Sequence, residues 1–531
     1  MPLLAIALSA YVAGLFAGFS GSLALGTVAV AAAIGIGVRY GSGVACAFAM
    51  LALTGAANAV ETRASDVRCL SAAAQRSVLA LELVDAAAPS SSGRASLVDC
   101  PVSVWLSVAH GEASGGSVVV ARGTVVSSQR GLLVQDATIT ILRAPSAASR
   151  WREATGRAID RTFGADAPLV RALLIADKHE LSPQIRDAFA AAGLAHILAI
   201  AGLHIGIIVV TLGLALELAG VSRQRAAALS VGLTICYVVM IGAPIPAIRT
   251  ATMLTAVNIT RLFQRPTSRW AIVAIGASQP VLDPRVVLEV GYQLSVVGVA
   301  AMIAATSLGN RLGVARSGEI VRMVVVTLIG STVATIATAP IVAWVFGRVS
   351  LIAPLSNLAA APLIAIAQPI LLCAVILTPA HGVAHFLADA AHPLLAGLTV
   401  VAATSASVPN GSLTVSPSVA AAVVAAIMAA GVVVACAVRD WVRPATVACA
   451  AAMVLAWLPM APALGGLVEL HMIDVGQGDA IALRTPHAHW ILFDAGRSWR
   501  GGDAGRSTIL PYLGRRGGRL DVFVLSHPHT D

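Results

Sequence analysis

The chain has few charged and few aromatic residues. Asp, Glu, Lys and Arg make up 11% of its 531 residues, and Phe, Trp and Tyr only 4%, whereas 57% are hydrophobic. With a mean hydropathy of +0.85, this composition excludes a string of ordinary water-soluble domains, because too little polar surface is available to cover them. Apolar runs near the roughly 20 residues that a helix needs to cross a bilayer recur between Leu3 and Leu464. The composition therefore predicts a polytopic membrane protein.

Two common motifs are also missing. No GxxxxGK[ST] phosphate-binding loop occurs, so any ATP-driven motor that this chain needs is expected to be another protein. None of the seven cysteines belongs to a CxxC pair, and five of them lie in apolar runs, where Cys acts as a small hydrophobic residue. Cys69 and Cys100 instead flank a polar stretch, and they could form a disulfide if that stretch faces an oxidising compartment.

The net charge of +9 does not by itself indicate a nucleic-acid partner, because the cytoplasmic loops of membrane proteins are rich in Arg. Placing the arginines between predicted spans in the cytoplasm satisfies the positive-inside rule. These are Arg39, Arg223, Arg225, Arg261, Arg265, Arg269, Arg311, Arg316, Arg322, Arg439 and Arg443. This orientation predicts a multi-pass protein of the inner (cytoplasmic) membrane whose residues 61–167 and 465–531 both lie outside the cytoplasm.

Four regions follow one another along the chain. Residues 1–60 hold three apolar segments, and residues 61–167 are polar. Residues 168–464 are apolar again, and residues 465–531 have a β-like pattern. Spans are predicted near 194–218, 226–243, 247–262, 270–282, 287–307, 320–346, 350–378, 380–406, 416–438 and 444–463.

The polar region alternates apolar and polar residues, which is the period of a half-buried strand. Four such runs predict a small β-barrel or sandwich inserted between spans, at Val78–Val84, Val102–Val108, Ser117–Val126 and Leu132–Leu142. Between Glu61 and Arg143, seven Arg balance seven acids and Trp105 is the one aromatic residue, which fits a structural or docking module at least as well as a single-strand binder. The basic piece Arg150–Gly164 favours an interfacial helix on lipid headgroups over a phosphate contact.

The stretch Ala191–Leu218 is long enough to span a membrane and carries His196 and His204. Eight residues apart, the two histidines would lie within one quadrant of a continuous helix. Gly202 and Gly206 form a GxxxG spacing around His204 that lets another helix approach closely. Ionisable groups at membrane depth usually face a bundle interior or a watery cavity. The spacing alone does not decide between a functional passage and histidines that only hydrogen-bond neighbouring helices.

The last residues form an HxHxD motif. A predicted strand, DVFVLS, brings His527 and His529 to its end, and Asp531 follows at the same alternate spacing. Two imidazoles and a carboxylate suit Zn²⁺ or Mn²⁺. This motif alone predicts a metal site of moderate specificity.

The segment GLAHILAIAGLHIG closely resembles the signature of ComEC-type competence proteins, the membrane channels for DNA uptake. Further segments are also similar to this family: VRALLIADKHELSPQIRDAFAAAG, PAIRTATML, LDP, GYQLS and FGRVSLIAPLSNLAAAPL. Ala201 departs from the family pattern, which often has Ser there. The resemblance covers nearly the whole chain and implies that the inserted β domain is OB-like.

The resemblance implies a conduit for single-stranded DNA. A polyanion cannot cross hydrocarbon, so its route needs polar or cationic groups that do not hold phosphate too tightly. The candidates are His196, His204, Gly202, Gly206, Arg249, Gln293 and Arg348. A headgroup contact would explain Arg348 equally well, and interhelical hydrogen bonding is the stronger alternative for Gln293. Membrane lipid, a DNA receptor and a separate cytoplasmic motor are the other expected partners.

The C-terminal segment is similar to the opening half of the metallo-β-lactamase-type hydrolase domain that ComEC-type proteins often carry. DVGQGDA, FDAG and the HxHxD motif support this resemblance. It implies that His527 and His529 bind one metal and that Asp531 helps to bind a second, as in two-metal nucleases, with the strand that is not imported as substrate. Asp474, Asp479 and Asp494 are expected to support the ligands rather than to bind metal.

The family's next histidine is absent after Asp531, and only residues 465–531 follow the last span. We therefore expect Zn²⁺ or Mn²⁺ to bind weakly or not at all, and the segment to be a truncated, inactive nuclease.

The sequence thus predicts about 11–13 helical spans, an inserted OB-like β-barrel and a truncated metallo-β-lactamase-like segment. The favoured hypothesis for its function is uptake of single-stranded DNA during natural transformation. Two alternatives stay open: a membrane-anchored, metal-dependent phosphodiesterase or nuclease, and a nonfunctional fragment of a longer competence protein. The helix with buried histidines favours the channel, since an anchor does not need them. The sequence does not determine the oligomeric state.

Overall fold

The computed structural model describes residues 3–526, apart from gaps at 101, 129–130, 201, 265–267, 315–317, 416–417, 458–466, 477, 488, 500–501 and 517–518. The chain forms two compact units. Unit 1 contains Met1–Arg161 and Ile208–Tyr292, and unit 2 contains Thr162–Ile207 and Gln293–Asp531. Each unit therefore combines segments that lie far apart in the sequence.

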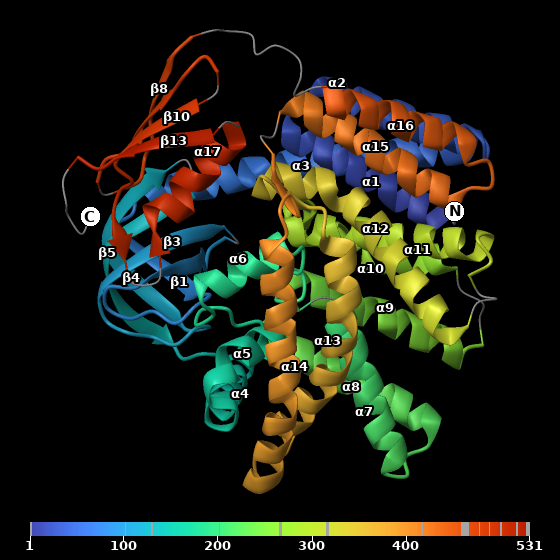
Figure 1. Ribbon diagram of the computed structural model, residues 1–531, viewed down its shortest axis with the longest axis horizontal. Helices are drawn as coiled ribbons and strands as arrows, with labels where there is room; N and C mark the ends of the chain where they lie inside the picture. The colour runs from blue at the N-terminus through green and yellow to red at the C-terminus, as the bar shows by residue number, and fades with distance from the viewer. Residues whose placement is uncertain are drawn as a thin grey trace. The chain divides into compact units, whose positions relative to one another are not determined.

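Three helices begin unit 1 (Figure 1): α1 (Leu3–Ser20), α2 (Leu23–Val38) and α3 (Ser42–Ala74). Small residues let α1 and α3 pack closely, because a Cβ at Gly14 would overlap the carbonyl oxygen of Ala52. At 1.5 Å per residue, the 33 residues of α3 extend for about 50 Å. This length exceeds the roughly 30 Å of a bilayer core, so α3 also carries the chain toward the polar domain.

A closed five-stranded barrel follows α3, with strand order β1-β2-β3-β5-β4. Its strands are β1 (Val78–Leu83), β2 (Ser92–Leu97), β3 (Ser103–His110), β4 (Val118–Ser128) and β5 (Gly131–Arg143). β3 and β5 are parallel, and the other pairs are antiparallel. Alternate residues such as Leu79, Leu81 and Leu83 fill its core, as the period-two pattern predicts. The structure places Cys69 and Cys100 in a disulfide that ties α3 to the segment between β2 and β3.

Further helices complete unit 1. They are α4 (Ala147–Phe163), α8 (Arg223–Met240), α9 (Ile245–Leu262), α10 (Arg269–Gly276) and the 3-10 helices η2 (Gln279–Val281) and η3 (Pro284–Leu288). α4 covers most of the predicted basic helix. The eight residues of α10 extend only about 12 Å, so the predicted span near 270–282 is wrong. Ala277, which follows α10, and the 3-10 turn of η2 end this helix before it is long enough to cross a bilayer.

Unit 2 consists mainly of long helices and one small sheet. Its helices are α5 (Ala167–Ile175), α6 (Pro183–Ala191), the start of α7 (Gly202–Leu218), most of α11 (Val290–Arg311), α12 (Glu319–Phe346), α13 (Ala353–Ile376), α14 (His381–Ser407), α15 (Val419–Ala437) and α16 (Val442–Trp457). The short strands β6 (Arg348–Ser350) and β7 (Ser412–Thr414) pair antiparallel beside α13 and α14. Arg311 caps the C-terminus of α15, because its guanidinium donates to the carbonyls of Ala435, Cys436 and Val438.

The C-terminal segment forms a four-stranded sheet with the order β13-β10-β9-β8. Its strands are β8 (Glu469–Met472), β9 (Ile481–Arg484), β10 (His489–Phe493) and β13 (Arg519–Val524). β10 and β13 are parallel, so both strands end at the same edge of the sheet. Helix α17 (Leu510–Arg516) contributes Leu513 to a core around the buried Trp490.

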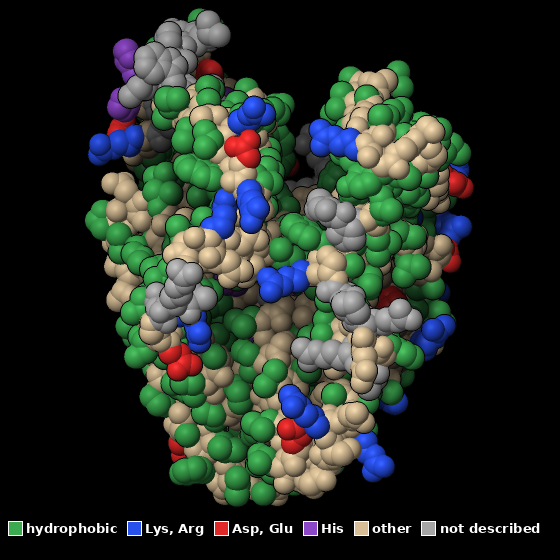
Figure 2. All heavy atoms as spheres, turned by 90° about the vertical axis from the view of Figure 1, so that its right-hand side faces the viewer, with side chains coloured by type: hydrophobic (Ala, Val, Ile, Leu, Met, Phe, Trp, Pro, Cys, Tyr) green, Lys and Arg blue, Asp and Glu red, His purple; other side chains and the backbone are tan. Residues whose placement is uncertain are grey.

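Seven helices among the described residues are long and apolar enough to cross a membrane: α1, α3, α11, α12, α13, α14 and α15. Three shorter apolar helices are α2, α7 and α16. Large hydrophobic side chains are exposed on several of them, for example Leu23 at 89% and Ile320 at 75%. Figure 2 shows hydrophobic side chains over much of one face, with charged side chains scattered among them. The prediction of a polytopic helical membrane protein is confirmed, as is a β-barrel between its spans.

Candidate functional site

His196 and His204 do not share a helix. α6 ends at Ala191 and α7 begins at Gly202, with turns between them. The predicted continuous helix over Ala191–Leu218 is therefore wrong.

Gly193 explains the break. It has φ +77°, a conformation that favours glycine after a helix C-terminus. The amides of Gly193 and Leu194 donate to the carbonyls of Ala190 and Phe189, which is the Schellman arrangement. A Cβ at Gly193 would also overlap Ala353 at the start of α13. Gly193 is thus the sequence signal for the end of α6. The apolar residues around it suggest a continuous helix instead.

The turns between α6 and α7 are well packed. Leu194, Ile197 and Ile200 are buried, and the Ser350 hydroxyl of β6 donates to the carbonyl of Ala191 at 2.8 Å. His196 Nδ1 lies 3.2 Å from the carbonyl oxygen of Gly193. In membrane proteins, non-helical backbone at membrane depth occurs where it is buried in protein or lines a water-filled cavity.

His204 is the third residue of α7, and only 1% of it is exposed. Its Nδ1 atom has no hydrogen-bond partner in the described part of the chain. Gly202 is the first residue of the helix. Within the described ranges, nothing lies within 4 Å of a Cβ built at Gly206. The close helix approach expected from the GxxxG spacing is therefore not found at Gly206 among these residues.

Arg249 of α9 is the largest buried cation, and only 1% of it is exposed. Its Nη1 lies 3.5 Å from the carbonyl oxygen of Tyr292, and its guanidinium carbon lies 5.7 Å from the centre of the Tyr292 ring. Its Nη2 has no hydrogen-bond partner among the residues that the structure describes. The Tyr292 hydroxyl donates to the carbonyl of Ala277 at 2.8 Å, which fixes the ring beneath the cation. Gly276 leaves room for the stem of Arg249, because a Cβ there would lie 3.1 Å from its Cγ.

The remaining membrane candidates lie in unit 2. Gln293 is partly buried near the start of α11. Arg348 is partly buried in β6 and pairs with Thr414 of β7. His196 and His204 belong to the same unit, whereas Arg249 belongs to unit 1.

Sequence reasoning missed one strongly paired cation. Arg285 of η3 binds the Asp66 carboxylate of α3 through Nη2 at 2.6 Å and through Nε at 3.1 Å. Its Nη1 also lies 3.2 Å from Asp283. The hydrogen bond to Asp66 raises the pKa of Arg285. No local pattern predicts this pair, because its partners are 219 residues apart.

Gln368 was also missed. It is completely buried in α13, its amide nitrogen donates to the carbonyl of Leu173 at 3.3 Å, and its amide oxygen has no partner in the described ranges. A lone polar residue within the apolar run of α13 was the available signal.

The acids of the C-terminal segment bind backbone amides. Asp474 accepts from the amide of Gly476 at 3.0 Å, and Asp494, at φ +53°, accepts from the amide of Ser526 at 2.8 Å. The carbonyl of Asp479 accepts from the amide of Gly496 at 3.0 Å. The Asp494 contact joins the ends of β10 and β13, immediately before the predicted metal ligands.

The predicted ligands His527, His529 and Asp531 lie outside the described residues. Within the described residues, no group of three or more His, Cys, Asp or Glu side chains is arranged to hold a metal. The backbone hydrogen bonds of Asp474 and Asp494 suit groups that shape loops around a site.

A second polar cluster lies on the same sheet. The His471 ring contacts the carboxylate of Glu469 at 2.9 Å and the hydroxyl of Tyr512 at 3.0 Å. The hydrogen bond from His471 lowers the pKa of Glu469.

The fold is that of a polytopic membrane protein with an inserted β-barrel and a C-terminal α/β segment. The model of the competence protein family matches residues 173–442, more than half of the chain. The chain therefore belongs to the competence protein family.

Curated relatives support this assignment. ComE operon protein 3 of Bacillus subtilis (strain 168) is 25% identical over 397 residues, which cover 68% of this chain and 48% of the relative. Competence protein ComA of Neisseria gonorrhoeae is 28% identical over 408 residues, 72% of this chain and 53% of the relative. Recombination protein 2 of Haemophilus influenzae is 44% identical over 63 residues, 12% of this chain and 8% of the relative. The chain spans about half the length of the first two relatives. No solved structure matches it.

Proposed function

We propose that this chain forms a conduit that passes a single DNA strand across the inner membrane during natural transformation. Membership in the competence protein family supports a role in DNA uptake. The observation that carries the finer proposal is Arg249, a cation with 1% exposure and no acidic partner among the residues that the structure describes.

A buried guanidinium without a counter-ion is costly, because desolvation is not offset by an opposite charge. A phosphate group would supply this charge, and the planar fork of Arg matches phosphate oxygens. The neighbouring Tyr292 ring and carbonyl hold the cation without neutralising it. Such a contact attracts DNA but leaves it free to move on, as a conduit requires.

The break before α7 supplies a second element of the proposed route. In transporters, the N-terminal ends of interrupted helices face anionic groups, since their amides carry partial positive charge. His204 lies in the first turn of α7, and its Nδ1 has no hydrogen-bond partner among the residues described. We include His196, Gly202, Gly206, Gln293 and Arg348 in the same proposed pathway.

The orientation is part of the proposal. About 11–13 spans would place the barrel and the C-terminal segment outside the cytoplasm. The Cys69–Cys100 disulfide supports this, because disulfides persist in oxidising compartments. The proposed partners are single-stranded DNA, membrane lipid, a DNA receptor and a separate motor.

The two appended domains have proposed identities. Five strands in the order β1-β2-β3-β5-β4 suit an OB-like barrel. The Asp494–Ser526 contact at the edge of the C-terminal sheet suits a metallo-β-lactamase-like segment, in which His527, His529 and Asp531 would hold Zn²⁺ or Mn²⁺. When bound, such a metal activates water for phosphodiester hydrolysis.

The test of the conduit is a variant with both His204→Ala and Arg249→Ala, expressed in a transformable host that lacks its own copy. We expect DNA uptake to be abolished while the protein remains in the membrane, measured by transformation frequency and by immunoblotting of membranes. Arg443→Ala is the matched control, because Arg443 is exposed at the start of α16. Unaltered uptake in the double variant would remove both residues from the pathway.

A further inference from the structure

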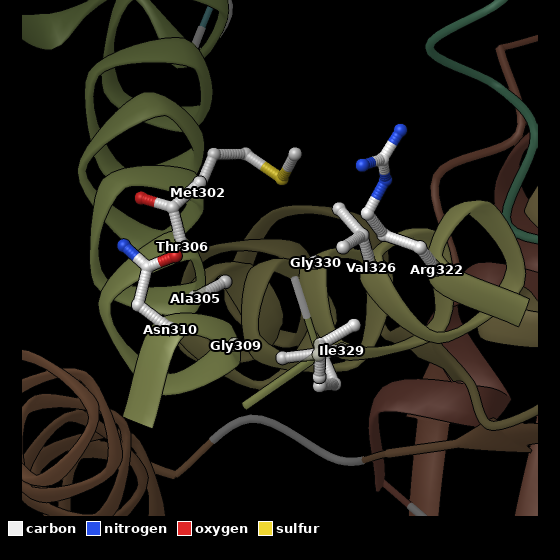
Figure 3. Close-up of a pocket in the computed structure, with 10 residues that line it drawn as sticks. Met302, Ala305, Thr306, Gly309, Asn310, Arg322, Val326, Ile329 and Gly330 are labelled. Carbon is white, nitrogen blue, oxygen red and sulfur yellow. The ribbon is translucent and has the colours of Figure 1, made fainter. Parts of the chain in front are cut away.

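A cavity of about 120 Å³ lies between α11 and α12 (Figure 3). The side facing it from α11 is formed by Met302, Ala305, Thr306, Gly309 and Asn310, and the side from α12 by Arg322, Val326, Ile329 and Gly330. Met302 extends from α11 toward α12 in this view. A Cβ at Gly330 would lie 3.1 Å from the Met302 sulfur. All these residues belong to unit 2.

The lining of the cavity is mainly apolar and contains one cation. Asn310 lies near the end of α11 and Arg322 near the start of α12. The two helices cross near Met302 and Gly330, and Figure 3 shows Asn310 and Arg322 on opposite sides of the cavity. Ala305, Val326 and Ile329 form an apolar body beside the Arg322 guanidinium. A cation next to an apolar body matches an amphipathic anion.

We propose that this cavity binds an anionic phospholipid, with the phosphate at Arg322 and part of one acyl chain in the apolar body. The guanidinium donates to phosphate oxygens in a fixed fork. Basic pockets between membrane helices bind anionic lipid headgroups by this chemistry.

Arg322 is available for such a contact. Its one ion pair in the described ranges is with Glu319, at 3.9 Å. The Glu319 side chain is 91% exposed and the Arg322 side chain 50% exposed, so solvent weakens their attraction. A phosphate group can therefore replace Glu319 as the partner of the Arg322 guanidinium.

The apolar body distinguishes a phospholipid from other anions. Ala305, Val326 and Ile329 offer no hydrogen bonds to inorganic phosphate. The lining also contains no aromatic ring on which a nucleic-acid base could stack. An acyl chain is the ligand group that gains most from this surface.

The lipid would strengthen a helix junction. Ala301, Ala304 and Ala305 of α11 pack with Val333 and Ala337 of α12. These are small side chains, and the cavity lies beside them, so a bound chain would add contacts that the protein itself lacks. We therefore expect the thermal stability of the protein to depend on anionic lipid.

Two variants test the space and the charge of the cavity. Gly309→Leu places a bulky side chain in the lining, and no heavy atom in the described chain lies within 4 Å of a Cβ at this position. Arg322→Gln removes the positive charge beside the apolar body. Arg443→Gln is the control, since Arg443 is an exposed arginine at another helix start.

The full chain is purified in detergent and titrated with phosphatidylglycerol, phosphatidylcholine or inorganic phosphate. Thermal unfolding and native mass spectrometry of retained lipid are the readouts. We expect phosphatidylglycerol to raise the unfolding temperature of the wild-type protein and of Arg443→Gln. Arg322→Gln should need roughly tenfold or more lipid for half of this effect, because a charged hydrogen-bonding group is lost, and Gly309→Leu should retain no lipid.

Equal responses of both cavity variants and the wild-type protein would overturn the proposal. An equal effect of phosphatidylcholine would also overturn it, since the headgroup charge would then be irrelevant. Equal protection by inorganic phosphate would show a free-anion site and would contradict the acyl-chain contact. Gly309→Leu could reduce stability without lipid, but Arg322→Gln lies at an exposed position and still tests the headgroup contact. The result does not depend on DNA transport.

Discussion

Arg249 and Arg285 lie in the same unit but have opposite surroundings. Arg249 is 1% exposed, and its contacts are a carbonyl oxygen at 3.5 Å and the face of Tyr292. The Arg285 side chain is 28% exposed and binds the carboxylates of Asp66 and Asp283. Within the described ranges, the better-buried cation is therefore the one that contacts no carboxylate.

In the proposed conduit, this difference distinguishes a structural charge from one that meets a ligand. Arg285 joins η3 to α3 through complementary hydrogen bonds, so its interactions are satisfied within the fold. Burial of Arg249 costs free energy that its contacts with Tyr292 offset only in part. The proposed conduit accounts for this cation by a transient contact with phosphate.

The largest expected effect comes from Arg249→Met. This change replaces a buried charge with an apolar side chain of similar length, so the thermal stability should stay unchanged or rise. DNA uptake should be lost, because the phosphate contact is gone. Transformation frequency and the unfolding temperature of the purified variant test both expectations. Normal uptake, or a marked loss of stability, would contradict the assignment of Arg249 to the DNA route.

Arg285→Met should have the opposite result. It leaves the partly buried Asp66 carboxylate without its cation, and we expect a loss of about 1–3 kcal/mol in the free energy of unfolding. Uptake per folded molecule should persist. Adding Asp66→Leu should restore part of the stability, because the unpaired charge is removed, and a double-mutant cycle measures this coupling. A stability loss that Asp66→Leu does not relieve would show that the ion pair is unimportant.

Tyr292→Phe sharpens the description of the Arg249 site. It keeps the ring beneath the guanidinium but removes the hydroxyl that donates to Ala277. We expect a stability loss of about 1 kcal/mol, as for one buried hydrogen bond, and nearly normal uptake. Chemical denaturation combined with the uptake assay provides the measurement. Complete loss of uptake would assign the hydroxyl itself to the pathway.

The smallest effect concerns Glu469. Its pair with His471 is more exposed to solvent than the contacts of the two arginines. Its pKa is lowered by the hydrogen bond from His471. A lowered pKa in the folded state stabilises the protein above the unfolded-state value, and this contribution is lost as the pH falls through the folded-state value. The stability difference between wild type and Glu469→Gln should therefore be small at pH 7 and disappear well below the ordinary Glu pKa of about 4.3. Thermal unfolding at several pH values measures it, and a difference that grows in acid would refute this explanation.

Local pattern predicted much of the fold. The barrel strands follow from the alternation of residues such as Leu79 and Leu81, because a period of two places them on one face. The long apolar runs predicted α12 to α15, since hydrophobicity averaged over a span is a local property. The break before α7 was not predicted, because the apolar run continues through residues whose backbone is not helical.

Part of the candidate site was also predictable. The histidines, Arg249 and Arg348 stand out as polar residues within an apolar chain. The partner of Arg249 could not be predicted, because its contact with Tyr292 joins residues 43 positions apart. The ligands expected at the C-terminal edge lie outside the described residues, so this prediction stays untested.

The sequence by itself determined that this is a membrane protein with an inserted β domain, because hydropathy and side-chain periodicity act over neighbouring residues. Only the tertiary structure decided that Arg249 is buried with no acid beside it in the described part of the chain, that Arg285 is paired, and that α7 begins at Gly202. The physical reason is that the free energy of a charge depends on its burial and its partners, and distant parts of the chain supply both.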